Sequence, residues 1–303
     1  MFTEFIHALF YSPLPFLRYA LLAGLAGSVA FGIVGTWVVT RRLTALAGAI
    51  SHAVLGGIGL AAWLRGGCGV EWLTPMGGAV LAAVAAAGII AIAGIYAKER
   101  EDAVINAVWA IGMSAGLLFL GITPGYVDLQ GYLLGNILLV TSSDLYTVLA
   151  LDAVVLALSI GFFQVILACS FDEEFAAMRG IRTKLVYFLM LLVTALTIVI
   201  FVNLIGIILV IALLTLPSAA AGQLVRRWSS MMALGALFCM TFTAVGLAGS
   251  YAWNLPPGPV IVLLAALCYV VIVAVKYAFR RLKPEKPVLY YFRNKSGKKN
   301  HED

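Results

Sequence analysis

The stretch LVYFLMLLVTALTIVIFVNLIGIILVIALLTLPSAAAGQLV, residues 185–225, contains no charged side chain. One bilayer crossing needs about 20 consecutive apolar residues, so this stretch is long enough for about two. Asn203 and Gly206 interrupt it near the middle, and we expect a tight turn there that separates spans near 185–203 and 205–225. Without that turn, the stretch is one long helix and the protein has one span fewer.

The whole chain has the composition of a multi-pass membrane protein. Of its 303 residues 63% are hydrophobic and 11% are charged, whereas soluble domains carry about a quarter charged residues. Further apolar runs lie near 17–39, 45–64, 75–97, 104–121, 145–168, 230–252 and 258–279. We therefore predict an all-α, polytopic transmembrane bundle of eight or nine spans at residues 17–280, preceded by an interfacial segment at 1–16.

The basic residues predict the orientation of this bundle. Most of the 20 Lys and Arg residues lie in alternate connections and in the tail at 281–303, and only Arg18 and Arg65 lie on the other side. The positive-inside rule places the tail and the C-terminus in the cytoplasm. The tail either lies on anionic lipid headgroups or serves only as a positive-inside anchor, and we predict no nucleic-acid partner.

The segment QGYLLGNILLV, residues 130–140, is too short to cross a bilayer and predicts a re-entrant or interfacial helix. Asp128 lies beside its external end, where it either receives a cation or is simply solvated. Asn136 lies within the segment and either lines a path or pins the helix in place.

His52 is a polar residue in the middle of an apolar span. By helical spacing it shares one face with small residues and a terminal tryptophan: Ala45, Gly48, Gly56, Gly59 and Trp63. Ten residues separate it from Arg42, which places it about 15 Å deep, near the bilayer midplane. Either the imidazole forms a hydrogen bond that holds two helices together, or it is a ligand on a cation path.

Three further residues within spans are candidates for the path or its gate. Asp152 is the only acid well inside a span, where it could face a water-filled cavity. Pro217 and Ser218 interrupt a span, and the serine could satisfy part of the backbone that the proline frees. With Gly48 and Gly56 they form a candidate gate or hinge. The alternative for Pro217 and Ser218 is a packing kink.

The segment SFDEEFAAMRGI, residues 170–181, predicts a short cytoplasmic helix of about two turns. Ser170 and Glu173 have capping-box spacing, acidic residues follow at the start of the helix, and Gly180 suits the position after its end. Its candidate contacts with a partner are Asp172, Glu173, Glu174, Phe175, Met178, Arg179 and Gly180. The alternative is an ordered loop that connects two spans and has no partner.

These motifs, in this order, resemble the membrane subunits of bacterial ABC importers for zinc, manganese or iron. The resemblance extends over residues 17–280 and is most specific in GYLLGNILLV and LPSAAA. It implies a type II ABC importer fold, a re-entrant helix, and the 170–181 helix as the ATPase-coupling helix. It also matches His52 to a histidine of the family's metal path, whereas the family's aspartate one turn earlier is replaced by Gly48.

The resemblance also implies a location and a set of partners. The protein would lie in the bacterial cytoplasmic membrane and pair with a second permease copy or a paralogue. A cytosolic ABC ATPase dimer and an extracytoplasmic metal-binding lipoprotein would complete the importer. The chain itself has no phosphate-binding loop, so ATP is bound by the partner subunit and this chain is not an enzyme. No cofactor is expected to be bound permanently, and the divalent metal is the cargo.

Two alternative functions remain open at this point. A permease for a larger chelate, such as a siderophore or cobalamin, shares the broad plan but resembles the chain less. An ion-coupled secondary carrier would need more acids within the membrane than Asp152.

Overall fold

The computed structural model describes residues 16–97, 101–124 and 140–282, together with residues 131, 133, 135 and 137. Throughout these residues the regular structure is helical, as the sequence predicts. The long helices are α2 (Phe16–Thr40), α3 (Thr44–Cys68), α4 (Pro75–Tyr96), α5 (Glu101–Ile122), α7 (Ser142–Gly161), α10 (Thr183–Ile205), α11 (Ile207–Leu224), α12 (Trp228–Trp253) and α13 (Pro257–Leu282). Two shorter helices, α8 (Phe163–Phe171) and α9 (Glu173–Met178), connect α7 to α10.

Nine of the described helices are long and apolar enough to span a membrane. The ninth exists because the apolar run at 185–225 is divided, as its sequence predicts, between α10 and α11. Only Gly206 separates these helices, and it has a φ of +83°, a conformation that favours glycine. The possibility of eight spans is thus excluded for the described chain.

The span predicted near 145–168 differs from the structure. The helix α7 begins earlier, at Ser142, because Thr141 and Asp144 form a reciprocal capping box at its start. It then ends at Gly161, and Phe162 separates it from α8. One predicted span is therefore a spanning helix followed by a separate short helix that leads into α9.

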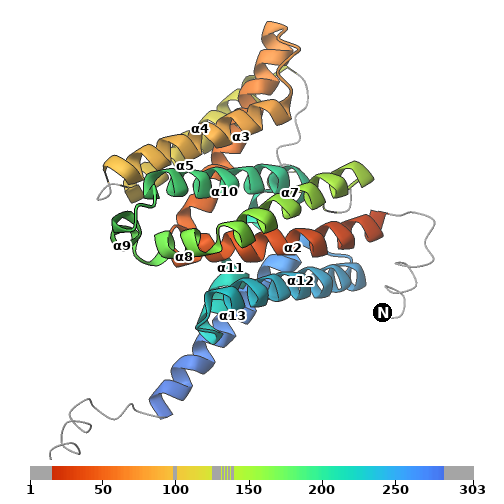
Figure 1. Ribbon diagram of the computed structural model, residues 1–303. Coiled ribbons are helices and arrows are strands. Elements are labelled where there is room, and N and C mark those ends of the chain that lie inside the picture. The colour runs from red at the N-terminus through yellow and green to blue at the C-terminus, as the bar shows by residue number, and fades with distance from the viewer. Residues whose placement is uncertain are drawn as a thin grey trace, which may run out of the picture.

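The helices form two groups on either side of a central layer (Figure 1). On one side, α3 packs against α4 and α5, and on the other α11 packs against α12 and α13. Between them, α2 contacts α7, α11 and α12, while α10 contacts α3 and α4. We call the end of the bundle at which α9, Arg41 and Glu101 lie the α9 end.

Glycine residues bring α3 and α5 unusually close together. A methyl group added at Gly112 would lie 2.6 Å from the backbone nitrogen of Ala53, and one added at Gly56 would lie 2.9 Å from the Gly112 carbonyl oxygen. One turn further, a methyl group at Gly59 would lie 2.8 Å from the carbonyl oxygen of Gly116. The face of small residues around His52 is therefore in direct contact with the backbone of α5. Small residues in membrane helices allow such close contact between backbones.

Most of the re-entrant helix predicted at 130–140 lies outside the described residues. Of those described, Gly135 has a φ of +67° and packs directly on the backbone of Ile205 and Gly206. Ile137 and Val140 are buried. This part of the segment is thus held against the corner between α10 and α11.

We predict that Gly112→Ala destabilises the protein by about 2 kcal/mol, because the added methyl group forces apart two backbones that cannot move independently. The measurement is thermal unfolding of the purified protein in detergent. Gly121→Ala, on the same helix, is the matched control because nothing lies within 4 Å of its added methyl group. If both variants unfold at the same temperature, the close contact between α3 and α5 is not formed.

Candidate translocation path and coupling helix

His52 lies inside the bundle, at the contact between α3 and α5. Its side chain is buried, and its ring stacks on Trp109 of α5 with centroids 5.2 Å apart and planes inclined by 22°. Among the described residues, its Nδ1 atom has no hydrogen-bond partner. A buried polar atom without a partner is uncommon and calls for an explanation such as an ion or a water molecule.

Gly48 allows Trp109 to take this position. A methyl group at Gly48 would lie 2.6 Å from Cζ3 of the indole, so any larger residue would displace the ring. The indole therefore occupies the space where the resemblance places an aspartate side chain. Sequence reasoning missed Trp109, although it lies three residues before Gly112 and seven before Gly116, on the same helical face.

His52 does not belong to a metal cluster within this part of the chain. The described residues contain no group of three or more His, Cys, Asp or Glu side chains that could hold a metal ion. A neutral imidazole can still serve as a single ligand to a passing transition-metal ion. Asp128 and Asn136, the predicted external part of the path, lie outside the described residues.

Asp152 is buried, but it faces a different neighbour from His52. Its Oδ1 atom accepts a hydrogen bond of 3.1 Å from the backbone N–H of Ala30 in α2. This bond joins α7 to α2, whereas His52 lies against α5. The Asp152 side chain thus links α7 to α2.

Pro217 and Ser218 lie where three helices meet. The helix α11 continues through Pro217, and Ser218 is packed between Gly35 of α2 and Gly235 of α12. The expectation that Ser218 satisfies the freed backbone is wrong, because its hydroxyl has no hydrogen-bond partner among the described residues.

A groove of about 360 Å³ lies at the surface between α8 and α10. Its lining is apolar except for Arg182 and includes Phe162, Ile166 and Met190. Because no carboxylate or imidazole lines it, this groove does not offer ligands to a cation.

The helix α9 forms where the sequence predicts it, but with a different cap. Asp172 is the N-cap, and its Oδ1 atom accepts a 2.9 Å hydrogen bond from the backbone N–H of Phe175. The predicted capping box of Ser170 and Glu173 is wrong, because Ser170 still belongs to α8 and donates its hydroxyl to the carbonyl of Ile166. Gly180, with a φ of +80°, follows the end of the helix as expected.

An apolar surface is exposed on α9. Phe175 is 43% exposed and Met178 is 80% exposed, while the guanidinium of Arg179 lies 4.6 Å from the centre of the Phe175 ring. Exposed side chains of this kind at the tip of a connection are typical of a docking surface.

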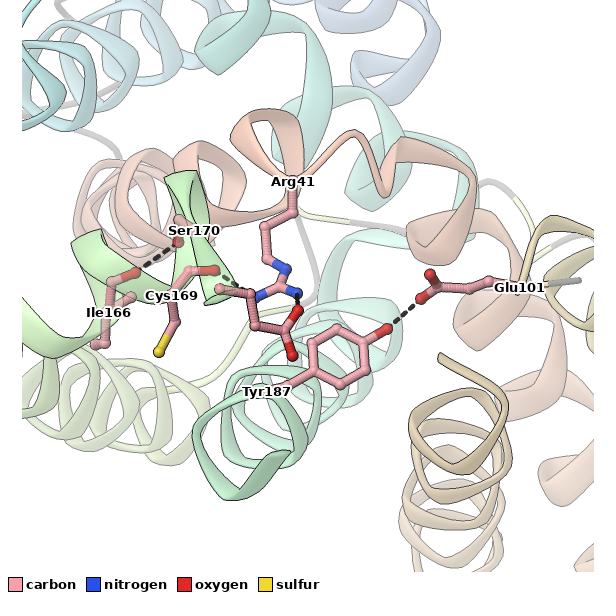
Figure 2. Close-up of polar contacts among 7 residues, drawn as sticks. Arg41, Glu101, Ile166, Cys169, Ser170 and Tyr187 are labelled. Atoms are coloured by element: carbon pink, nitrogen blue, oxygen red, sulfur yellow. Dashed lines mark hydrogen bonds and ion pairs between the residues drawn. The ribbon is translucent and has the colours of Figure 1, made fainter. Parts of the chain in front are cut away.

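Behind α9, a polar cluster ties the helix to the rest of the bundle (Figure 2). Arg41 donates a 2.9 Å hydrogen bond to the carbonyl of Cys169 and forms an ion pair of 3.4 Å with Glu173. Its guanidinium also lies 4.5 Å from the centre of the Tyr187 ring, and the Tyr187 hydroxyl donates a hydrogen bond to Glu101. Sequence reasoning missed Arg41, Tyr187 and Glu101 in this role, because the partners are far apart in the chain: 132 residues separate Arg41 from Glu173, and 86 separate Tyr187 from Glu101.

This geometry defines a multi-pass helical membrane protein with a short, exposed helix, α9, between two of its candidate spans. The model of the ABC 3 transport family matches residues 13–276, and the chain belongs to this family. The resemblance to metal ABC permeases is therefore confirmed.

Individual relatives match over nearly the full length of the chain. A probable metal transport system membrane protein of Chlamydia pneumoniae is 36% identical over 276 residues, which are 91% of this chain and 93% of the relative. The manganese transport system membrane protein MntC of Listeria monocytogenes is 31% identical, over 84% of this chain and 88% of the relative. The solved structure of PsaBC from Streptococcus pneumoniae in complex with Fab has a TM-score of 0.79 and 29% identity, covering 93% of this chain and 99% of that one.

We predict that Asp172→Ala weakens α9 by about 1 kcal/mol, since the first turn loses its capping carboxylate. Hydrogen exchange of the amides at residues 173–178 should then become about fivefold faster. Ser170→Ala is the control, and it should leave this exchange unchanged because Ser170 bonds within α8. Faster exchange in Ser170→Ala and unchanged exchange in Asp172→Ala would show that Ser170 is the cap.

Proposed function

We propose that this chain is the transmembrane subunit of an ATP-driven importer that carries a divalent transition-metal ion into the cytoplasm. The observation that carries the proposal is the family match over residues 13–276 combined with a buried imidazole at the α3–α5 contact. Manganese is the first candidate among zinc, manganese and iron, because relatives with 31% identity are named as manganese transport proteins.

In this proposal the α9 end faces the cytoplasm of a bacterial cell. Most of the basic residues that the structure describes lie at that end, which agrees with the positive-inside rule. Two copies of the permease, or this chain and a paralogue, enclose the path, and an extracytoplasmic binding protein delivers the ion. ATP is bound and hydrolysed by separate ATPase subunits, whose closure pulls on α9 and changes which side of the membrane the path opens to.

His52 is proposed as a transient ligand on the path. Its unpartnered Nδ1 supports this role, because a nitrogen that only held helices together would be paired. A single imidazole binds weakly, and weak binding suits an ion that must leave again. The second copy, water or the region around Asp128 and Asn136 would supply the remaining ligands.

We predict that His52→Phe and His52→Gln each lower Mn²⁺ uptake about tenfold or more, as expected when a metal ligand is lost. The measurement is uptake of the ion by proteoliposomes that contain the complete transporter. The two variants are complementary, because phenylalanine keeps the stack on Trp109 and glutamine keeps a polar group.

Thermal unfolding of the same variants shows whether a loss of uptake is caused by a less stable bundle or by the loss of a ligand in a bundle that is still folded. If His52 only stabilises the bundle, His52→Phe should transport normally, since the ring stack is retained. Normal uptake in both variants would exclude His52 from the path.

The helix α9 is proposed as the surface that docks the ATPase. Phe175 and Met178 are the apolar contacts of this surface, and Asp172, Glu173, Glu174, Arg179 and Gly180 shape or flank it. Because a charge buried in an apolar contact is costly, Met178→Asp should greatly reduce co-purification of the ATPase with the permease.

The matched control is Trp253→Asp, which places the same charge on an exposed residue where α12 ends, at the opposite end of the bundle. It should leave co-purification unchanged. Equal losses in the two variants would mean that Met178 is not part of the docking surface.

A further inference from the structure

The polar cluster behind α9 lies at the N-terminal ends of α3, which contains His52, and of α5, which contains its stacking partner Trp109. Arg41 is in the turn before α3, which begins at Thr44, and Glu101 is the first residue of α5. His52 and Trp109 each lie eight residues beyond these starts, at the same depth of about 12 Å along their helices. The two helices run in the same direction, so their starts lie together at the α9 end.

From this geometry we infer that Arg41, Glu173, Tyr187 and Glu101 form a latch that transmits the displacement of α9 to the α3–α5 pair. This inference rests on the proposed function and names the residues that connect its two sites. Arg41 and Tyr187 are positioning residues, because they act on the path through helices and do not touch the ion.

The contacts of Arg41 suit it for this role. Its side chain is only 15% exposed and that of Glu173 is 29% exposed, so water screens the attraction between the two charges less than in a fully exposed pair. The same guanidinium holds the Cys169 carbonyl at the end of α8 and faces the Tyr187 ring on α10. If α9 moved and the turn before α3 did not follow, several of these contacts would have to break at once.

Tyr187 extends the latch to the second helix. Its ring meets the guanidinium of Arg41, and its hydroxyl donates to the carboxylate of Glu101. Since the glycine contacts join the backbones of α3 and α5 along their length, the two helices move as one body. The latch contacts the α3–α5 pair at the first residues of both helices. A displacement of α9 therefore moves the two helices together.

The test uses the complete transporter, with its ATPase subunits, in proteoliposomes. Arg41→Gln removes the charge, and Tyr187→Phe removes only the hydroxyl that reaches Glu101. We expect ATP hydrolysis and complex assembly to stay within about twofold of wild type, while the metal transported per ATP falls about fivefold or more, the lower range of allosteric coupling. Arg42→Gln is the matched control, because Arg42 is the exposed neighbour of Arg41.

A purely structural role would give a different result. It would lower assembly, ATP hydrolysis and transport together, so the ratio of metal to ATP would not change. A ratio within about twofold of wild type in both variants overturns the latch. If Arg41→Gln does not assemble, Tyr187→Phe decides the question.

A second measurement separates the latch from the identity of the cargo. Spin labels at Ile122→Cys at the far end of α5 and Trp253→Cys at the end of α12, both exposed positions, report the distance between the α3–α5 pair and a helix that the latch does not contact. In a background without the native cysteines, ATP trapping should change this distance in wild type and leave it unchanged in Arg41→Gln. A change of equal size in both, or none in wild type, overturns the latch. A transporter that moves with ATP but carries no metal contradicts the proposed function alone.

Discussion

The close contact between α3 and α5 is the constraint on which the rest of the structure depends. In a bilayer, apolar helices gain little by leaving lipid for one another, so their association depends on backbones that approach closely. Gly56 and Gly59 on α3 meet Gly112 and Gly116 on α5, and this contact fixes the spacing and register of the pair. That register then places His52 opposite Trp109, and the starts of both helices together behind α9.

The same contact explains how the bundle accommodates a histidine near the middle of a membrane span. An imidazole exposed to lipid would be costly, and here the indole of Trp109 covers it. Gly48 leaves the space for that indole. At the position where the resemblance implies an acidic side chain, Gly48 is thus paired with a bulky aromatic side chain on the neighbouring helix.

Several elements follow from local sequence patterns. The spans follow from runs of apolar residues, and the division between α10 and α11 follows from Gly206, because a φ of +83° favours a residue without a Cβ atom. The helix α9 follows from its acidic start and from Gly180 after its end. Its cap was assigned wrongly, because Ser170 and Asp172 are both good capping residues, and only the end of α8 decides which of them is free to cap.

The sequence by itself determined the class of protein, the spans, the basic end and the face of α3 that carries His52, because these depend on composition and helical periodicity. Only the tertiary structure decided what that face contacts, that Asp152 bonds to α2, and that Arg41 links α9 to Tyr187. The physical reason is that these contacts join residues far apart in the chain: 122 residues separate Asp152 from Ala30, and 132 separate Arg41 from Glu173. No periodicity within one helix specifies its partner, since a small face fits any backbone that comes close enough, and the packing of the whole bundle makes that choice.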